Sequence, residues 1–338
     1  MNRRFFVLAA TALATCVVSP LAHAADELRV MVHSSFSLPK PLLAQFETQT
    51  GVKLAIIKGG NAGEMLNKLI LTKAQPLADV VFGIDNTLAA KAQAAGVLEP
   101  GLPPAMADAG LGAAVAAVDY GFVTLNYDKA AIAKSGLALP KTLQELTLPA
   151  YKATLVVPNP ATSSPGYAFL LATIAGLGEE EAFAWWAQMR ANGLKVAKGW
   201  SEAYYTEFTR GGGTHPLVVS YATSPAAEVF YAKEKLTESP TASLNLKGGV
   251  FRQVEGVALL KGGSQREAAL KFVDFLRSAP VQEALQTSMW MYPVQAQTPR
   301  ASVLRHAAEP ASFDSLPLQT VADKGAQWVA RWTQVVLK

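Results

Sequence analysis

Hydrophobic positions in the first third of the chain alternate between two spacings. Short apolar runs at 28–32, 52–57 and 79–82 predict buried strands, and segments with helical spacing at 41–50 and 63–72 separate them. This alternation indicates an α/β fold with a mostly parallel sheet that helices cover on both faces. Ligands of such sheets bind beyond the carboxyl ends of the strands, so we expect a binding site at that edge.

The residues that follow these strands form the predicted rim of the site. His33 ends the first strand, Asn61 and Ala62 follow the second, and Asp85 and Asn86 follow the third. Asn86 also has a side chain suited to capping the helix that comes next. The pattern therefore brings an imidazole, an amide and a carboxylate to one edge of the sheet.

The remainder of the chain repeats the α/β pattern. An extended stretch at 116–127 predicts a strand that crosses between two lobes, and a second set of units begins at Leu155. A helix is expected at 179–191, and another at 264–277, where Ser264 and Glu267 have the spacing of a capping box.

Two strand-to-helix junctions share one sequence pattern. The run Ser163-Ser164-Pro165 follows the apolar residues 155–157, and the run YATSP at 221–225 follows the apolar residues 217–219. Serine is a favoured N-cap, and proline fits the first helical position. Backbone N–H groups at a helix start attract anionic or polar groups. We therefore predict that both junctions face one ligand.

Several aromatic residues lie at the ends of elements, where side chains often line sites. Trp200, Tyr204, Tyr221, Trp290 and Tyr292 stand beside Gly, Ser, Thr or Pro, and they are suited to walling a flat or cationic ligand. The other tryptophans follow helical spacing and are expected in the core, namely Trp185, Trp186, Trp328 and Trp332.

The first 24 residues have the features of an export signal. Arg3 and Arg4 precede an apolar stretch at 5–18, and an A-x-A site predicts cleavage after Ala24, which implies a periplasmic protein. Loss of the two arginines lowers the formal charge of +4 by two, too little to indicate nucleic-acid binding. Cys16 is the only cysteine, so thiol nucleophiles and thiolate metal sites are excluded after cleavage.

Five segments carry a resemblance to a known family. They are DVVFGIDN at 79–86, DYGF at 119–122, KGWSEAY at 198–204, SYATSP at 220–225 and WMYPV at 290–294. In order along the chain, they closely resemble the periplasmic thiamine-binding proteins of bacterial ABC importers. The resemblance implies a type II periplasmic binding fold with two lobes, a hinge between them and the ligand in the interlobe cleft.

The resemblance also implies lobe boundaries, a ligand and partners. Lobe 1 would comprise 25–122 and about 254–296, and lobe 2 would comprise 123–253 and about 297–338. The ligand would be thiamine, thiamine monophosphate or thiamine diphosphate, with no other cofactor and no metal. A monomeric protein would deliver it to an ABC permease and its ATPase in the inner membrane.

Site residues follow from the resemblance position by position. Ser163 and Ser164 would hold the phosphate or hydroxyethyl end, and Trp290 would stack on a ring. Further contacts would come from Trp200, Tyr221, Ala222, Thr223 and Ser224. The first lobe departs from the family, because Asn61-Ala62 replaces Asp-Gly and His33 replaces a tyrosine. Asp85 is the candidate to supply the missing carboxylate.

Three other functions remain compatible with the sequence. The adjacent phenols of Tyr204 and Tyr205 could bind ferric iron. Ser163 or Ser201 could serve a periplasmic hydrolase of thiamine phosphates, although no motif of hydrolases, metalloproteases or P-loop enzymes occurs. A binding protein of the same fold could also report its ligand to a membrane receptor.

Overall fold

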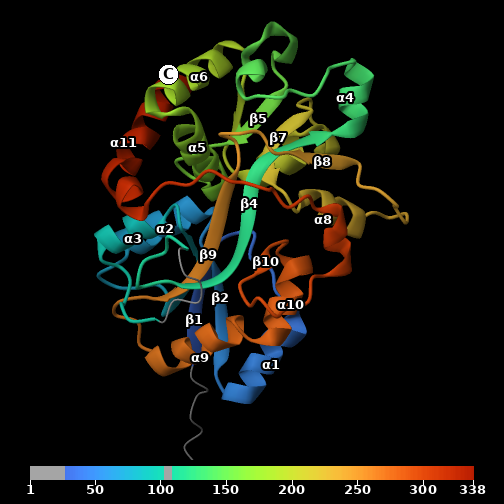
Figure 1. Cartoon of the computed structure of the whole chain (residues 1–338). Coiled ribbons are helices and arrows are strands. Elements are labelled where there is room, and N and C mark those ends of the chain that lie inside the picture. The colour runs from blue at the N-terminus through green and yellow to red at the C-terminus, as the bar shows by residue number, and fades with distance from the viewer. Residues whose placement is uncertain (1–26, 103–108) are drawn as a thin grey trace, which may run out of the picture.

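One continuous, curled sheet runs through both halves of the molecule (Figure 1). The computed structural model describes residues 27–102 and 109–338, so the predicted export signal lies outside the described residues. The strands are β1 (Glu27–Val32), β2 (Lys53–Lys58), β3 (Val80–Asp85), β4 (Ala116–Asp128), β5 (Leu155–Pro158), β6 (Lys195–Ala197), β7 (Leu217–Tyr221), β8 (Thr241–Leu244), β9 (Phe251–Leu259) and β10 (Tyr292–Pro293). Their order is β2-β1-β3-β9-β4-β7-β5-β6, and β8 and β10 both pair with β4.

Helices cover both faces of this sheet (Figure 1). They are α1 (Lys40–Thr50), α2 (Ala62–Leu71), α3 (Ala89–Ala95), α4 (Lys129–Ser135), α5 (Ser164–Leu177), α6 (Glu179–Ala191), α7 (Trp200–Glu202), α8 (Ser224–Phe230), α9 (Arg266–Leu276), α10 (Ala279–Ser288) and α11 (Leu318–Leu337). Alternate residues of β1 face opposite sides, so Val30 belongs to one apolar cluster with Phe46 and Phe272, and Met31 belongs to another with Met65. The α/β fold with a largely parallel first sheet region is therefore confirmed.

The predicted strands of the first third are confirmed as β1, β2 and β3, and β1 pairs in parallel with both of its neighbours. The predicted helices at 41–50, 63–72 and 179–191 correspond to α1, α2 and α6. Gly51 ends α1 with φ of +71°, a backbone conformation that glycine adopts without strain.

The long strands β4 and β9 connect the two halves. β9 pairs with β3 in the first half, β4 pairs with β7 in the second, and the two strands are antiparallel to each other. Figure 1 shows both running the length of the sheet. The expected crossing strand at 116–127 is thus confirmed as β4. The lobe boundaries at 122/123 and 253/254 fall within these strands and stay predictions.

Two predicted helix caps are wrong. Asn86 does not cap α3, because its side chain bonds the backbone of Arg252 and Val254 at 3.0 and 3.1 Å. The N–H groups of Thr87 and Leu88, just before the helix, donate to Asp85 instead. The Ser264–Glu267 capping box is also absent. Ser264 donates to the Asp79 carboxylate, and Glu267 pairs with Lys271 at 3.0 Å. In both cases a tertiary partner competes with the local cap.

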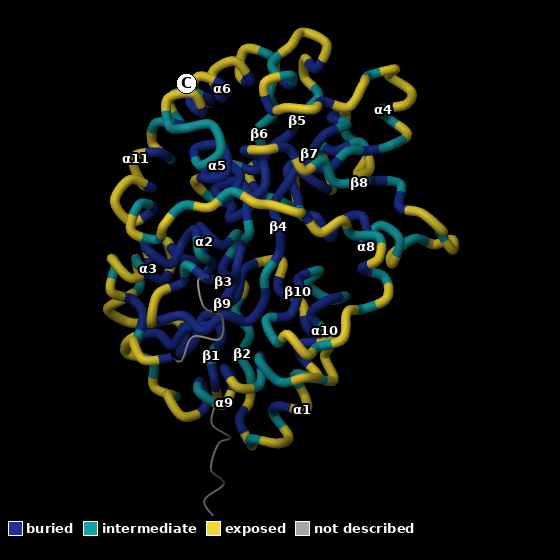
Figure 2. Tube along the Cα trace, in the orientation of Figure 1, coloured by how far each residue is buried: buried dark blue, intermediate teal, exposed yellow. Residues whose placement is uncertain are grey.

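Burial follows the expected pattern (Figure 2). The four tryptophans predicted in the core are all buried, and Trp186 packs edge-on against both Trp185 and Trp332. Of the helices within residues 27–102 and 109–338, none has the length and apolar character needed to cross a membrane.

Candidate functional site

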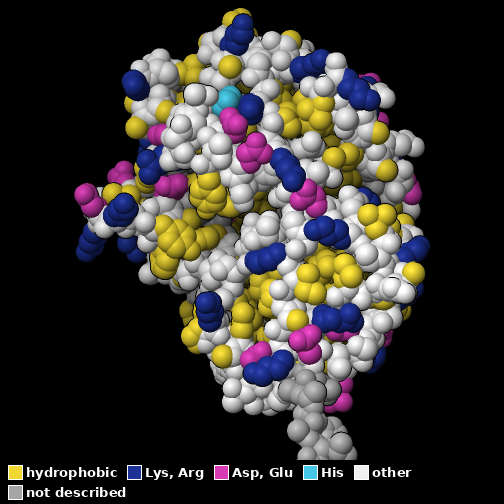
Figure 3. Space-filling model, turned by 180° about the vertical axis from the view of Figure 1, so that it is seen from behind, with side chains coloured by type: hydrophobic (Ala, Val, Ile, Leu, Met, Phe, Trp, Pro, Cys, Tyr) yellow, Lys and Arg dark blue, Asp and Glu magenta, His cyan; other side chains and the backbone are white. Residues whose placement is uncertain are grey.

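A cavity of about 370 Å³ lies between the two halves, at the carboxyl ends of several strands. His33 follows β1, Asn61 follows β2, Ser163 follows β5 and Tyr221 ends β7, and all four line it. Seen from behind, the molecule is hollowed between its halves, and hydrophobic side chains gather there (Figure 3). The expectation that the site lies at this edge agrees with this geometry.

The first half contributes four polar residues and one alanine to this side of the cavity. His33, Ser34, Ser35, Asn61 and Ala62 line it. Asn61 is the N-cap of α2, and its backbone N–H donates to the Glu64 carboxylate at 2.9 Å in a capping box. The departure from the family at Asn61 therefore also has a local structural role.

The two halves touch beside Asn61. Glu64 pairs with Lys198 of the second half at 3.2 Å, and Gly199 lies so close to the Asn61 side chain that a Cβ there would clash. A Cβ on Gly63 would lie 3.0 Å from the carbonyl of Thr162. These close approaches indicate that the cavity is closed on this side.

The first Ser-Pro junction lies at the cavity as predicted. Ser163, Ser164 and Pro165 line it where β5 leads into α5. The helix begins one residue earlier than the pattern predicted, because Ser163 rather than Ser164 is the N-cap. The Ser163 side chain makes no capping hydrogen bond. The start of a 14-residue helix is nonetheless directed at the cavity.

The second junction is also confirmed as a strand-to-helix turn, with Thr223 rather than Ser224 at the N-cap. Tyr221, Thr223 and Ser224 line the cavity, whereas Ala222 is buried in an apolar cluster with Phe122. Ala222 therefore does not lie where its side chain could touch a ligand. A hydroxyl on Ser220 links Ser224, at 2.8 Å, to the Trp200 indole N–H, also at 2.8 Å.

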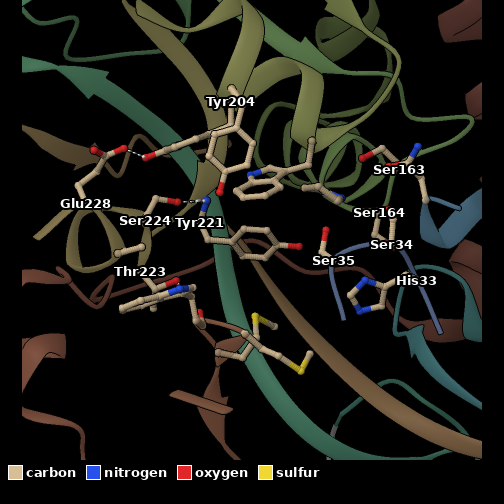
Figure 4. Close-up of a pocket in the computed structure, with 18 of the residues that line it drawn as sticks. His33, Ser34, Ser35, Ser163, Ser164, Tyr204, Tyr221, Thr223, Ser224 and Glu228 are labelled. Atoms are coloured by element: carbon tan, nitrogen blue, oxygen red, sulfur yellow. Dashed lines mark hydrogen bonds between the residues drawn. The ribbon is translucent and has the colours of Figure 1, made fainter. Parts of the chain in front are cut away.

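Six aromatic side chains wall the cavity, namely Trp200, Tyr204, Tyr205, Tyr221, Tyr231 and Trp290. Trp200 stacks on Tyr204 with ring centroids 5.3 Å apart. The Tyr221 side chain extends across the pocket toward Ser35 and His33 (Figure 4). Tyr292, which the sequence suggested as a wall, is buried instead and packs beneath Arg300.

Trp290 has an unusual backbone. Its φ is +61°, a value that bulky residues adopt only when their surroundings hold them there. The Thr223 hydroxyl donates to the Trp290 carbonyl oxygen at 2.7 Å, and Phe230 and Tyr231 pack edge-on against the indole. These contacts fix the orientation of the ring at the cavity.

Two carboxylates that sequence reasoning missed line the cavity. Glu228 accepts from the Tyr204 hydroxyl at 2.9 Å and pairs with Arg210 at 3.2 Å. Glu255 lies 3.6 Å from the His33 imidazole and accepts from Gln253 at 3.1 Å. Polar residues at alternate positions of an otherwise apolar strand were the signal that could have revealed Glu255. Other missed lining residues include Ser34, Ser35, Arg210, Tyr231, Met289 and Met291.

Asp85 lies behind the cavity rather than in its lining. Its side chain is fully buried and accepts hydrogen bonds from Thr87 at 2.6 Å and from Gln253 at 2.9 Å. Burial raises the pKa of Asp85 to about 6, although the hydrogen bonds from Thr87 oppose the shift. The expectation that Asp85 contacts the ligand is corrected by this position.

Comparison with known proteins agrees with a binding site that is enclosed between two halves. The sequence profile of the bacterial extracellular solute-binding proteins matches residues 75–321. This chain belongs to that family. Among its relatives, this solute-binding protein is 31% identical to the thiamine-binding periplasmic protein of Salmonella typhimurium, over 93% of this chain and 95% of the relative. It is 29% identical to the protein of the same description from Escherichia coli K12, over 91% and 93%.

Solved structures confirm the two-lobed fold of this solute-binding protein. A periplasmic thiamin binding protein superposes with a TM-score of 0.82 at 29% identity, covering 93% of this chain and 98% of the other. A ferric binding protein from Campylobacter jejuni superposes with a TM-score of 0.73 at 19% identity, covering 91% and 99%. The second likeness is one of fold alone.

Proposed function

We propose that this solute-binding protein binds thiamine and its phosphate esters and delivers them to an ABC permease and its ATPase. The observation that carries the proposal is the cavity between the halves, which six aromatic side chains and two carboxylates line. The relatives at about 30% identity are themselves described as thiamine-binding. The proposed location is the periplasm, with cleavage after Ala24, and the proposed state is a monomer.

The cavity matches the chemistry of thiamine in two respects. The thiazolium ring carries a permanent positive charge, and aromatic faces such as those of Trp200, Tyr221 and Trp290 attract cations. A phosphate or hydroxyethyl tail would suit the start of α5, where Ser163 and Ser164 line the cavity. The flat aminopyrimidine ring would stack on a remaining aromatic face.

The arrangement of the halves agrees with capture by closure. Ligand contacts would come from both sides of the cavity, and Asn61 already packs against Gly199 across the gap. Hinge motion about connecting strands is the usual way in which such proteins open and close. Release would follow when docking on the permease separates the halves.

A direct experiment is to purify the protein and identify any bound small molecule by mass spectrometry. Calorimetric titration of ligand-free protein with thiamine, thiamine monophosphate and thiamine diphosphate would then rank the ligands. We expect at least one of them to bind with a micromolar or lower Kd, which corresponds to a binding free energy of about −8 kcal/mol or more favourable. No measurable heat or fluorescence change with all three would refute the proposal.

Ferric binding is less well supported by the site. Iron would require deprotonated phenols, but burial raises the pKa of both Tyr204 and Tyr205, and the negative charge of Glu228 raises them further. The Tyr204 hydroxyl also donates a hydrogen bond to Glu228, which favours the protonated phenol. Addition of ferric citrate should therefore produce no visible charge-transfer band. A red complex would favour the iron function.

We infer binding without turnover. Among the described residues, no side-chain hydrogen bond joins Ser163 to a histidine or carboxylate that could act as a base, and Ser201 is exposed outside the cavity lining. Incubation with thiamine monophosphate should leave it intact, as judged by chromatography. Release of phosphate that disappears on Ser163→Ala would support the hydrolase instead.

A further inference from the structure

Buried acidic side chains lie on the strands that join the two halves. Glu255 of β9 lines the cavity, and Asp119 of β4 stands directly opposite it in the strand register. Glu255 is 5% exposed and Asp119 is 0% exposed. Cross-strand partners face the same side of a sheet, so the two carboxyl groups form one pair at the base of the cavity.

Glu255 has a weaker positively charged partner than Glu228 has. Glu228 has the permanent cation of Arg210 at 3.2 Å as well as a hydroxyl donor. Among the described residues, Glu255 has His33 at 3.6 Å, which is positive only when protonated, and the amide of Gln253. A buried carboxylate without a fixed counter-charge is costly, and an incoming cation would relieve that cost.

Asp119 is a second buried acidic side chain, and it has no hydrogen-bond partner in the described part of the chain. Neither of its carboxyl oxygens has a hydrogen-bond partner among the described residues. Burial raises its pKa well above the usual value, and the neighbouring charge of Glu255 raises it further. Two like charges opposite each other are unfavourable, which favours a proton on Asp119.

The remaining titratable groups around this pair come from four elements. They are His33 after β1, Asp85 on β3, Tyr167 on α5 and Tyr221 on β7. Gln253 connects three of the side chains, because its amide donates to both Asp85 and Glu255 and its oxygen accepts from the Tyr221 hydroxyl. The hydrogen bonds that join this network come from an amide and a hydroxyl group.

We propose that Glu255 recognises the positive charge of the ligand and that Asp119 is the proton-holding partner that makes this recognition depend on pH. The proposal rests on the proposed binding of thiamine. A cation beside Glu255 favours the ionised form of every carboxyl nearby, including Asp119 and Asp85. Binding should therefore release protons in mildly acidic solution, and thiamine affinity should rise as the pH rises from 5.5 to 7.5.

The test is calorimetric titration with thiamine at pH 5.5 and 7.5, each in two buffers with different heats of ionisation. Wild-type protein should release a measurable fraction of a proton at pH 5.5, and its affinity should be at least threefold lower there. Glu255→Gln should lower thiamine affinity at least tenfold at pH 7.5. Asp119→Asn should reduce the number of protons released, a readout that a purely structural role would not change.

Glu267→Gln is the matched control, because it removes the same charge from an exposed position on α9. It should bind like wild type. If Glu255→Gln does not fold, as judged by circular dichroism, Glu255→Asp is the alternative. It keeps the charge but moves it away from the cavity by one methylene, so thiamine affinity should fall by less than tenfold.

The outcomes separate the two proposals. Wild-type affinity in folded Glu255→Gln would overturn the role of Glu255 while leaving thiamine binding intact. The absence of proton release by wild-type protein would overturn the role of Asp119. If wild-type protein failed to bind thiamine at all, the proposed function itself would be refuted, and this inference with it.

Discussion

The Thr223 hydroxyl donates a hydrogen bond to the carbonyl oxygen of Trp290 at 2.7 Å. This bond ties the start of α8 to a loop on which Trp290 adopts a φ of +61°. A side chain far away in the sequence therefore holds the aromatic wall in an unfavourable backbone conformation. Because the ring is already ordered without ligand, less conformational entropy is lost when the ligand binds.

Thr223→Val should test this relationship. The substitution removes the hydroxyl while keeping a branched side chain, and a hydrogen bond of this kind contributes about 0.5–1.5 kcal/mol. We expect thiamine affinity to fall by about two- to tenfold, because the Trp290 loop relaxes. Tryptophan fluorescence titration measures it, and Thr48→Val on the exposed face of α1 is the control. An unchanged Kd would show that the loop is held by packing alone.

Removal of an aromatic wall should have a larger effect. Trp290→Ala and Tyr221→Ala should each weaken thiamine binding at least tenfold, about 1.4 kcal/mol, because each deletes a face available to the cationic ring. Phe313→Ala removes a more exposed ring outside the cavity lining and should leave the affinity unchanged. Full affinity in both cavity variants would contradict the assignment of these walls.

Tyr221 has two separable contributions. Its hydroxyl donates to Gln253 at 3.1 Å, and its ring walls the cavity. Tyr221→Phe should therefore bind more tightly than Tyr221→Ala but less tightly than wild type. Titration of the three proteins under one condition distinguishes stacking from the hydrogen bond.

Closure should depend on the absence of a side chain at Gly199. A Cβ there would collide with the Asn61 side chain across the gap between the halves. Gly199→Ala should lower thiamine affinity and leave the radius of gyration larger with ligand than that of liganded wild type, as measured by small-angle X-ray scattering.

Relief of the clash provides the control for Gly199→Ala. Adding Asn61→Gly removes the side chain in the way, and glycine is tolerated at an N-cap at a cost of a few tenths of a kcal/mol. The double variant should therefore recover compaction with ligand. If it stays as open as the single variant, the collision with Asn61 is not the cause.

Stability should depend on pH through Asp85. Burial raises its pKa from 3.8 to about 6, so the folded protein holds this proton more tightly than the unfolded chain. The contribution of the group to the free energy of unfolding thus falls as the pH rises from about 4 to 6, by about 3 kcal/mol in all. Relative to wild type, Asp85→Asn should gain about this amount between pH 4 and pH 8.

Urea denaturation at the two pH values measures this difference. The hydrogen bond to Gln253 that the substitution alters contributes equally at both values, so the change between them isolates the charge. Asp274→Asn on α9 is a control for the loss of a carboxyl and should show no such gain. A constant offset for Asp85→Asn would mean that its proton is held no more tightly in the folded protein.

Much of the fold could be predicted from local patterns. The strands of the first third, the helix at 179–191 and the crossing strand β4 follow from hydrophobic spacing, which depends only on neighbouring residues. The caps at Asn86 and Ser264 could not, because Val254 and Asp79 supply partners from distant parts of the chain.

The candidate site divides in the same way. Junctions with a local signature, at Ser163 and at Thr223, lie at the cavity as expected. Glu255 was missed because its meaning depends on the strand register that places it opposite Asp119. Ala222 was included through the resemblance, but alternation along the chain turns its side chain into an apolar cluster.

The pairing of β4 with β9 gives the cavity a fixed base. Asp119 and Glu255 belong to one ladder of backbone hydrogen bonds, so they keep their positions relative to each other when the halves rotate. The aromatic rings belong to segments outside that ladder and travel with their own half. An arriving ligand would thus meet the same acidic base in the open molecule as in the closed one, and only the number of rings around it would change.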